Sequence, residues 1–85
     1  IFVAALAIPF AIFLGHSGFE KALLIAVLML VLIVELINSA IEAIVDRISE
    51  EKHELSKRAK DLGSAAVFLS CLNVVVVWFY ILIWR

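Results

Sequence analysis

The sequence is poor in charge, cysteine, glycine and proline. Of its 85 residues only 18% are charged, and Cys71 and Pro9 are the single cysteine and the single proline. One cysteine cannot form an internal disulfide, and the lack of a cysteine–histidine cluster argues against a zinc site. The net charge of −1 argues against the basic surface on which nucleic-acid binding depends.

Glycine is scarce as well, and occurs only at positions 15, 18 and 63. Neither glycine-rich phosphate loop, G-x-x-x-x-G-K-(S/T) or G-x-G-x-x-G, is therefore present. A nucleophile elbow and a Ser-His-Asp order are also missing. If the protein handles ATP, carboxylate-held Mg²⁺ and a lysine have to replace the usual loop.

Apolar residues are abundant, at 66% of the chain, with a mean hydropathy of +1.18. The few charges are concentrated, and ten of them lie between Asp46 and Asp61. A soluble domain this small needs charged residues over most of its surface. The sequence therefore predicts an all-α membrane protein, with residues 1–85 forming one membrane domain.

Three apolar segments predict three transmembrane helices, at about residues 1–15, 19–48 and 55–84, with a connector at about 49–54. Residues 15–18, with two glycines, form the first turn. The first segment is short for a span of ~20 residues, and we therefore expect the numbered sequence to begin inside the first helix of a longer protein.

The distribution of basic and aromatic residues predicts an orientation. Lys21 is the one basic residue at the first turn, whereas five flank the connector: Arg47, Lys52, Lys57, Arg58 and Lys60. The positive-inside rule then puts the connector in the cytoplasm. The aromatic residues Trp78, Tyr80 and Trp84 predict an aromatic belt at the opposite interface.

The second helix is polar only in its second half. At about 100° per residue, its polar side chains fall within an arc of about 100°: Glu35, Asn38, Ser39, Glu42 and Asp46. The helix would be roughly 45 Å long against a hydrocarbon core of about 30 Å, so the polar half should protrude, with Glu35 near the boundary.

This polar stripe indicates either a catalytic or ion-binding face, or polar contacts between helices. An acidic residue at the membrane centre costs ~2.5–3.5 kcal/mol, which favours a functional role for Glu35 and Glu42. Asp46 beside Arg47 is expected to be an interfacial pair or a cap. On the third helix Lys60, Ser64 and Cys71 share one face, with Asp61 adjacent. That charged pair is either a solvated helix end or a cation and a carboxylate for a phosphate ligand.

Two stretches carry a resemblance to a known family. They are ELINSAIEAIVDR at residues 35–47 and ELSKRAKDLGSAA at residues 54–66. Together they closely resemble the signature of prokaryotic diacylglycerol kinases, E-x-x-N-(S/T)-A-I-E-x-x-V-D followed by H-x-L-(S/A)-x-x-A-K-D-x-(G/A)-(S/A)-A-A-V.

The resemblance implies a membrane enzyme with three helices per protomer that works as a homotrimer with active sites shared between subunits. It implies ATP-dependent phosphorylation of diacylglycerol to phosphatidic acid, with Mg²⁺, at the cytoplasmic face of the inner membrane. The family also has an amphipathic surface helix carrying a further metal-binding glutamate. This helix is missing from the sequence, and we expect it just upstream.

The resemblance also implies roles for single residues. Glu35 would be the general base and touch the lipid, and Glu42 would hold Mg²⁺ with the ATP phosphates. Asn38 and Asp46 would support the site, and Ser64 would lie near the lipid. Nucleotide contacts would come from Glu42 and from five residues further along the chain: Glu51, Lys52, His53, Lys60 and Asp61.

Three alternatives stay open at this point. The same chemistry on undecaprenol is found in a branch of the family. An ion-coupled carrier could use Glu35 as an intramembrane relay, but would leave Lys60 and Asp61 idle. A purely structural helical subunit would leave the clustered carboxylates unexplained.

Overall fold

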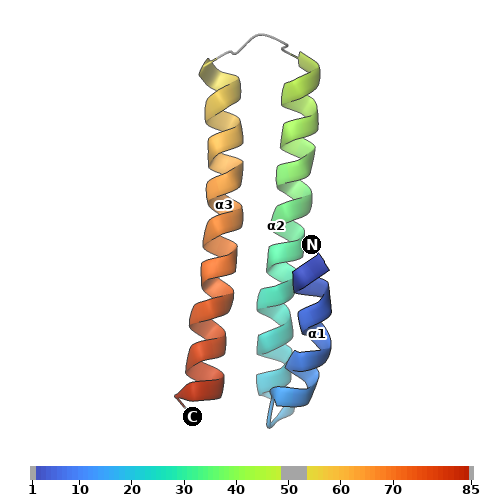
Figure 1. Ribbon diagram of the computed structural model, residues 1–85, viewed down its shortest axis with the longest axis vertical. Coiled ribbons are helices and arrows are strands. Elements are labelled where there is room, and N and C mark those ends of the chain that lie inside the picture. The colour runs from blue at the N-terminus through green and yellow to red at the C-terminus, as the bar shows by residue number, and fades with distance from the viewer. Residues whose placement is uncertain (1, 49–53, 85) are drawn as a thin grey trace.

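The computed structural model describes residues 2–48 and 54–84, and within these ranges the chain is helical except for residues 15–17 and 84, and has no strand. Helix α1 comprises Phe2–Leu14, α2 Gly18–Ile48 and α3 Glu54–Trp78, and a π-helical segment, η1, continues α3 over Phe79–Ile83. Figure 1 shows α2 and α3 as two long antiparallel helices, with α1 beside the N-terminal part of α2. The long axis of the molecule, 51 Å, is therefore that of the α2–α3 pair.

Helix α2 begins at a capping box. The backbone N–H of Glu20 donates to Ser17 Oγ at 3.1 Å, and Glu20 Oε1 accepts a hydrogen bond from the N–H of His16 at 2.9 Å. The bond to Ser17 Oγ satisfies one N–H group that the first turn of the helix leaves without a partner, and the bond from His16 ties the turn before the helix to that first turn. The helix consequently starts at Gly18, one residue earlier than the hydropathy predicts.

The turn between α1 and α2 is closed tightly at Gly15. Its N–H donates to the carbonyl oxygen of Ala11 at 3.1 Å. A Cβ at Gly15 would lie 2.5 Å from Lys21 Cγ and 2.9 Å from the Lys21 backbone nitrogen. Only glycine admits this approach, and it lets α1 fold back against α2.

The core lies where α1, α2 and α3 meet. Ala11, Leu24 and Leu28 are buried together, and Val74 and Trp78 of α3 pack against them. The indole Nε1–H of Trp78 donates to the carbonyl oxygen of Leu24 at 3.3 Å, using the second lone pair of a helical carbonyl. This hydrogen bond links α3 to α2 within the apolar half of the pair.

The aromatic residues expected to form one belt therefore divide into two environments. Trp78 lies on the face of α3 that packs on α2, so its N–H points inward rather than to an interface. Tyr80 and Trp84 are exposed, with ring centroids 6.5 Å apart in an edge-to-face contact.

The end of the third helix also differs from the prediction of a continuous α-helix to residue 84. The Trp84 N–H donates to the carbonyl oxygen of Phe79, five residues earlier, at 3.2 Å. This five-residue spacing is the hydrogen-bond pattern of a π-helix. Nothing in the sequence pattern signals this change.

Two helical stretches, Gly18–Arg47 and Glu54–Ile83, are long and apolar enough to cross a membrane, and Phe2–Leu14 is a shorter apolar helix. Large apolar side chains cover the outside, and Phe2 and Phe13 are 83% and 86% exposed. Soluble monomers rarely expose continuous apolar surface of this kind, which in a membrane protein contacts lipid or other subunits. The all-α membrane fold agrees with the prediction. The number of spans, the single domain and the trimer stay predictions.

Candidate active site

The polar stripe of α2 is turned toward α3. Asn38 lies against Gly63 of α3, Asp46 pairs with Lys60, and Glu35 lines a cavity together with Cys71. Residues spaced three, four and seven apart lie on one face of a helix, which explains why these side chains point the same way. The antiparallel packing of the two long helices then gives each of them a neighbour on α3.

The protruding end of the stripe carries an ion pair. Lys60 Nζ lies 2.5 Å from Asp46 Oδ1, and the two side chains are 42% and 64% exposed. The partner of Asp46 is thus a residue of the neighbouring helix, where the sequence suggested its chain neighbour Arg47. An exposed pair contributes ~0.2–1 kcal/mol to stability. Its larger consequence is that it holds an ammonium group at the open end of the stripe.

The side-chain amide of Asn38 lies in the middle of the stripe, between Glu42 of the same helix and Gly63 of α3. Asn38 Nδ2 donates to Glu42 Oε1 at 3.4 Å. Asn38 Oδ1 is buried and has no hydrogen-bond partner within the described residues. A Cβ added at Gly63 would overlap Oδ1 and lie 3.1 Å from Cγ of Asn38. Gly63 thus provides the space in which the amide lies, with its NH₂ turned toward the carboxylate of Glu42.

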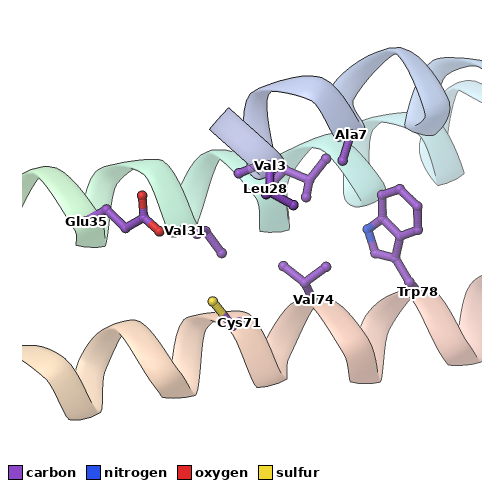
Figure 2. A pocket seen from close by; sticks show the side chains of 9 residues that line it. Val3, Ala7, Leu28, Val31, Glu35, Cys71, Val74 and Trp78 are labelled. Atoms are coloured by element: carbon purple, nitrogen blue, oxygen red, sulfur yellow. The ribbon is translucent and has the colours of Figure 1, made fainter. Parts of the chain in front are cut away.

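Glu35, at the inner end of the stripe, lines an apolar cavity of about 360 Å³ between the three helices. Figure 2 shows the carboxylate at one end of this cavity and Trp78 at the other. The other lining residues are apolar or a thiol: Val3, Ala4, Ala7, Leu28, Val31, Cys71 and Val74. The acid thus lies partly buried beside a space that an apolar ligand can occupy.

The structure describes only some of the remaining predicted site residues. Ser39 on α2, and Asp61 and Ser64 on α3, are exposed. An exposed Asp61, one residue after Lys60, leaves a carboxylate accessible beside the ion pair. Glu51, Lys52 and His53, the predicted nucleotide contacts in the connector, lie outside the described residues.

Sequence reasoning missed two residues of this region, Gly63 and Trp78. Gly63 lies inside a helix, where glycine costs ~1 kcal/mol relative to alanine, and this cost is a signal that a close packing contact compensates for it. Trp78 was assigned to the interfacial belt from its position near the chain end. The sequence did contain a signal that Trp78 points inward. It shares an apolar helix face with Cys71 and Val74, which precede it by seven and four residues.

The carboxylates allow a test of whether a metal ion fits. Among residues 2–48 and 54–84 there is no group of three or more His, Cys, Asp or Glu side chains that could hold a metal ion. Mg²⁺ that arrives with a nucleotide needs only one or two protein carboxylates, because phosphate oxygens and water complete its octahedron. The exposed Glu42 carboxylate, beside the Asn38 amide, fits this second arrangement and not a closed protein cage.

The groups therefore follow one another along the helix pair in a defined chemical order. An acid lies beside an apolar cavity, an amide and a second carboxylate come next, and an ammonium–carboxylate pair lies at the exposed end. This order suits a reaction between an apolar alcohol and a charged, phosphate-bearing molecule that approach from opposite sides of a membrane boundary.

Comparison with known proteins gives a family match over nearly the whole chain. The family model for prokaryotic diacylglycerol kinase matches residues 1–82. The diacylglycerol kinase of Pseudomonas aeruginosa is 58% identical over 76 residues, which cover 89% of this chain and 62% of that protein.

Two further relatives agree. The diacylglycerol kinase of Escherichia coli K12 is 53% identical over 79 residues, covering 93% of this chain and 64% of that protein. That of Haemophilus influenzae is 51% identical over 77 residues, covering 91% and 65%. The chain thus spans slightly less than two thirds of the length of these curated relatives.

Proposed function

The chain belongs to the prokaryotic diacylglycerol kinase family, and on that premise we propose that it phosphorylates diacylglycerol to phosphatidic acid with ATP. We place the reaction at the cytoplasmic face of the inner membrane. The observation that carries the proposal is the order of groups along α2 and α3, from Glu35 beside an apolar cavity to the Asp46–Lys60 pair at the exposed end.

In this proposal Glu35 is the general base. The lipid hydroxyl lies at the polar end of the cavity and gives its proton to the Glu35 carboxylate. The lipid oxygen forms a bond to the γ-phosphorus while the bond from that phosphorus to the β,γ-bridging oxygen breaks, and ADP leaves with the electron pair. Phosphoryl transfer of this kind needs mainly positioning and charge neutralisation.

The exposed end of the stripe would bind the nucleotide. Lys60 brings a positive charge to the phosphates, and its pairing with Asp46 fixes where that charge lies. Asp61 is exposed one residue further along and is available to the nucleotide. Glu51, Lys52 and His53 would complete the proposed nucleotide contacts, and Ser64 would lie near the lipid substrate.

Glu42 would hold Mg²⁺ together with the ATP phosphates, and the ion would supply neutralisation of the charge that develops on the transferring phosphoryl group. The Asn38 amide, which donates to Glu42 Oε1, orients that carboxylate along the stripe. Hydrogen bonds of this kind to a metal-binding carboxylate orient it toward the metal.

The proposed assembly is a homotrimer with sites shared between subunits. Its support is the apolar surface that a single chain leaves exposed on all three helices, with Phe13, Leu36 and Leu69 as examples. The exposed side of the Glu42–Lys60 region is then where a neighbouring subunit would complete the nucleotide site.

The experiment that tests the function is phosphate transfer from γ-labelled ATP in detergent–lipid mixed micelles. Purified full-length protein is offered diacylglycerol or undecaprenol, and the labelled lipid is identified by chromatography. We expect label in phosphatidic acid. Label only in undecaprenyl phosphate would overturn the substrate, and no labelled lipid with either acceptor would overturn the kinase.

A further inference from the structure

The cavity between Glu35 and Trp78 has the form of a binding site for a chain. We propose that it holds one acyl chain of the lipid substrate, and that Trp78 is the end wall that limits how long this chain can be. The inference rests on the proposed function, because it takes the alcohol phosphorylated at Glu35 as the ligand.

The cavity is elongated along the helices. Its polar end is Glu35, and its far end is the indole of Trp78, which is bonded to the carbonyl oxygen of Leu24 (Figure 2). Leu24 and Glu35 are eleven positions apart on α2, which corresponds to about 16 Å at 1.5 Å per residue. Val31 and Leu28 of α2, and Cys71 and Val74 of α3, line the length between these ends.

The chemistry of the lining selects the occupant. Glu35 is the one charged residue among the residues that line the cavity, and the indole N–H of Trp78 already donates to Leu24. A ligand with a polar group deep in the cavity would leave that group without a partner, which costs several kcal/mol in an apolar environment. The ligand that fits carries one proton-bearing polar group at the Glu35 end and an alkyl chain beyond it. A lipid alcohol has this form.

Trp78 is suited to act as a fixed wall. Its indole packs against the buried cluster of Ala11, Leu24 and Leu28, and its hydrogen bond to Leu24 holds the ring plane. Tryptophan has only two side-chain torsions, so it loses little conformational freedom when it is held in this way. A chain that reaches the ring therefore has to bend or withdraw its head group from Glu35.

The proposed selectivity for acyl-chain length comes from how well the chain fits the cavity, and not from the hydrophobic effect. Lipid tails are as apolar as the cavity, so moving a chain from the bilayer into the cavity gains little by itself. One methylene beyond the length that a hydrophobic pocket accommodates costs at least about tenfold in kcat/KM. The wild type should therefore show a maximum in kcat/KM against acyl length.

The first experiment changes the length of the cavity. The full-length protein is assayed with a series of diacylglycerols that differ only in acyl length. Val74→Phe, which fills the middle of the cavity, should move the maximum to shorter chains, with about a tenfold change in the ratio of short- to long-chain kcat/KM. Val74→Leu should move it less in the same direction, and Trp78→Ala should move it to longer chains.

Val75→Phe is the matched control. Val75 is the next residue of α3, is 63% exposed, and does not line the cavity. Its length profile should match that of the wild type. If the profiles of the two Val74 variants also keep the wild-type maximum, the inference is overturned.

A second readout does not depend on catalysis. Cys71 is the only cysteine of the chain and lines the cavity, so its alkylation by a maleimide reports occupancy at one position. Dioctanoylglycerol, without ATP, should slow alkylation several-fold in the wild type and have little effect in Val74→Phe. Equal rates with and without the lipid overturn the inference, as does a thiol that never reacts because a neighbouring subunit fills the cavity.

The two readouts separate this inference from the proposed function. Protection of Cys71 by the lipid, in a protein that phosphorylates no lipid alcohol, would contradict the kinase and retain the chain site. Kinase activity with a flat length profile and an unprotected Cys71 would retain the kinase and contradict the chain site.

Discussion

The two halves of the α2–α3 pair are built differently. In the half near the α1–α2 turn, the buried side chains of α2 lie close together, at Leu24, Val27, Leu28 and Val31. In the half toward the connector, every described side chain of α2 beyond Val31 is half-buried or exposed. The polar contacts in this half include those from Asn38 to Glu42 and from Asp46 to Lys60.

This difference separates the packed core from the proposed site, which lie at opposite ends of one helix pair. The apolar half holds the fold by packing and by the Trp78–Leu24 hydrogen bond. The polar half leaves the Glu42 carboxylate and the Asp46–Lys60 pair accessible, as a site must if substrates are to reach them. Glu35 lies at the junction, because it lines the apolar cavity and begins the polar stripe.

The largest expected effect on stability comes from Leu24→Ala in the apolar half. Leu24 is fully buried, and its truncation should lower the free energy of unfolding by about 2 kcal/mol, the lower end of the range for buried leucine because the membrane reduces the transfer contribution. Unfolding by SDS, followed by circular dichroism, measures this. Leu36→Ala, at a position 63% exposed in the polar half, is the matched control. Equal destabilisation by both variants would contradict the proposed division.

The next effect concerns the metal dependence of the polar half. Glu42→Gln keeps the size of the side chain and removes its charge, so half-saturation with Mg²⁺ should require on the order of 10–100-fold more metal. Activity titrated with Mg²⁺ at fixed ATP measures the shift. The unfolding midpoint should not change, because Glu42 is exposed. An unchanged Mg²⁺ titration would count against the metal role.

A smaller effect on activity is expected from Gly63→Ala, which tests whether Gly63 positions the Asn38 amide or only packs against it. Gly63→Ala places a methyl group where Asn38 Oδ1 lies, so the amide must move away from Glu42. We expect a loss of activity of about threefold to tenfold, corresponding to one hydrogen bond worth ~1 kcal/mol, with a raised Mg²⁺ requirement.

Gly18→Ala is the control for this substitution, because a Cβ at Gly18 meets no atom within 4 Å. It should leave the Mg²⁺ requirement unchanged. Pairing Gly63→Ala with Asn38→Ser, which shortens the side chain, should relieve the overlap without restoring the bond to Glu42. Recovery of full activity in the double variant would show that Gly63 acts only through packing.

The smallest expected effect is at the exposed ion pair. A double-mutant cycle of Asp46→Asn and Lys60→Met should give a coupling free energy of unfolding of ~0.2–1 kcal/mol, because both side chains are substantially exposed. The coupling should fall further at high salt. Thermal unfolding of the four proteins at low and high ionic strength measures it. A coupling well above this range would mean that the polar half contributes to stability as the apolar half does.

The sequence predicted those features of the fold and the site that depend on a single helix. The apolar runs predicted the helices, and the 100° repeat put Glu35, Asn38, Glu42 and Asp46 on one face. The neighbours of these residues on α3 depend on how far the two helices slide past each other, and the periodicity of either helix carries no information about that register. The pairing of Asp46 with Lys60 and the approach of Asn38 to Gly63 were unpredicted for this reason.

Two other features were missed because more than one rule fits the same residues. A tryptophan near the end of an apolar helix fits both an interfacial belt and a core position, and only the rotation of α3 against α2 decides between them for Trp78. The Ser17–Glu20 capping box was visible in the sequence, but Gly15 before it and Gly18 within it led to the interpretation of a simple turn.

The central claim is that Glu35, at the junction of the two halves, takes the proton from the lipid hydroxyl. Its most direct test is the rate of phosphate transfer to diacylglycerol by Glu35→Gln, measured beside the unfolding midpoint of the same variant. A rate reduced by about 10²–10⁴-fold, with the midpoint of the wild type, is the expected result for the loss of a general base. A variant that folds normally and transfers phosphate at close to the wild-type rate would contradict the claim.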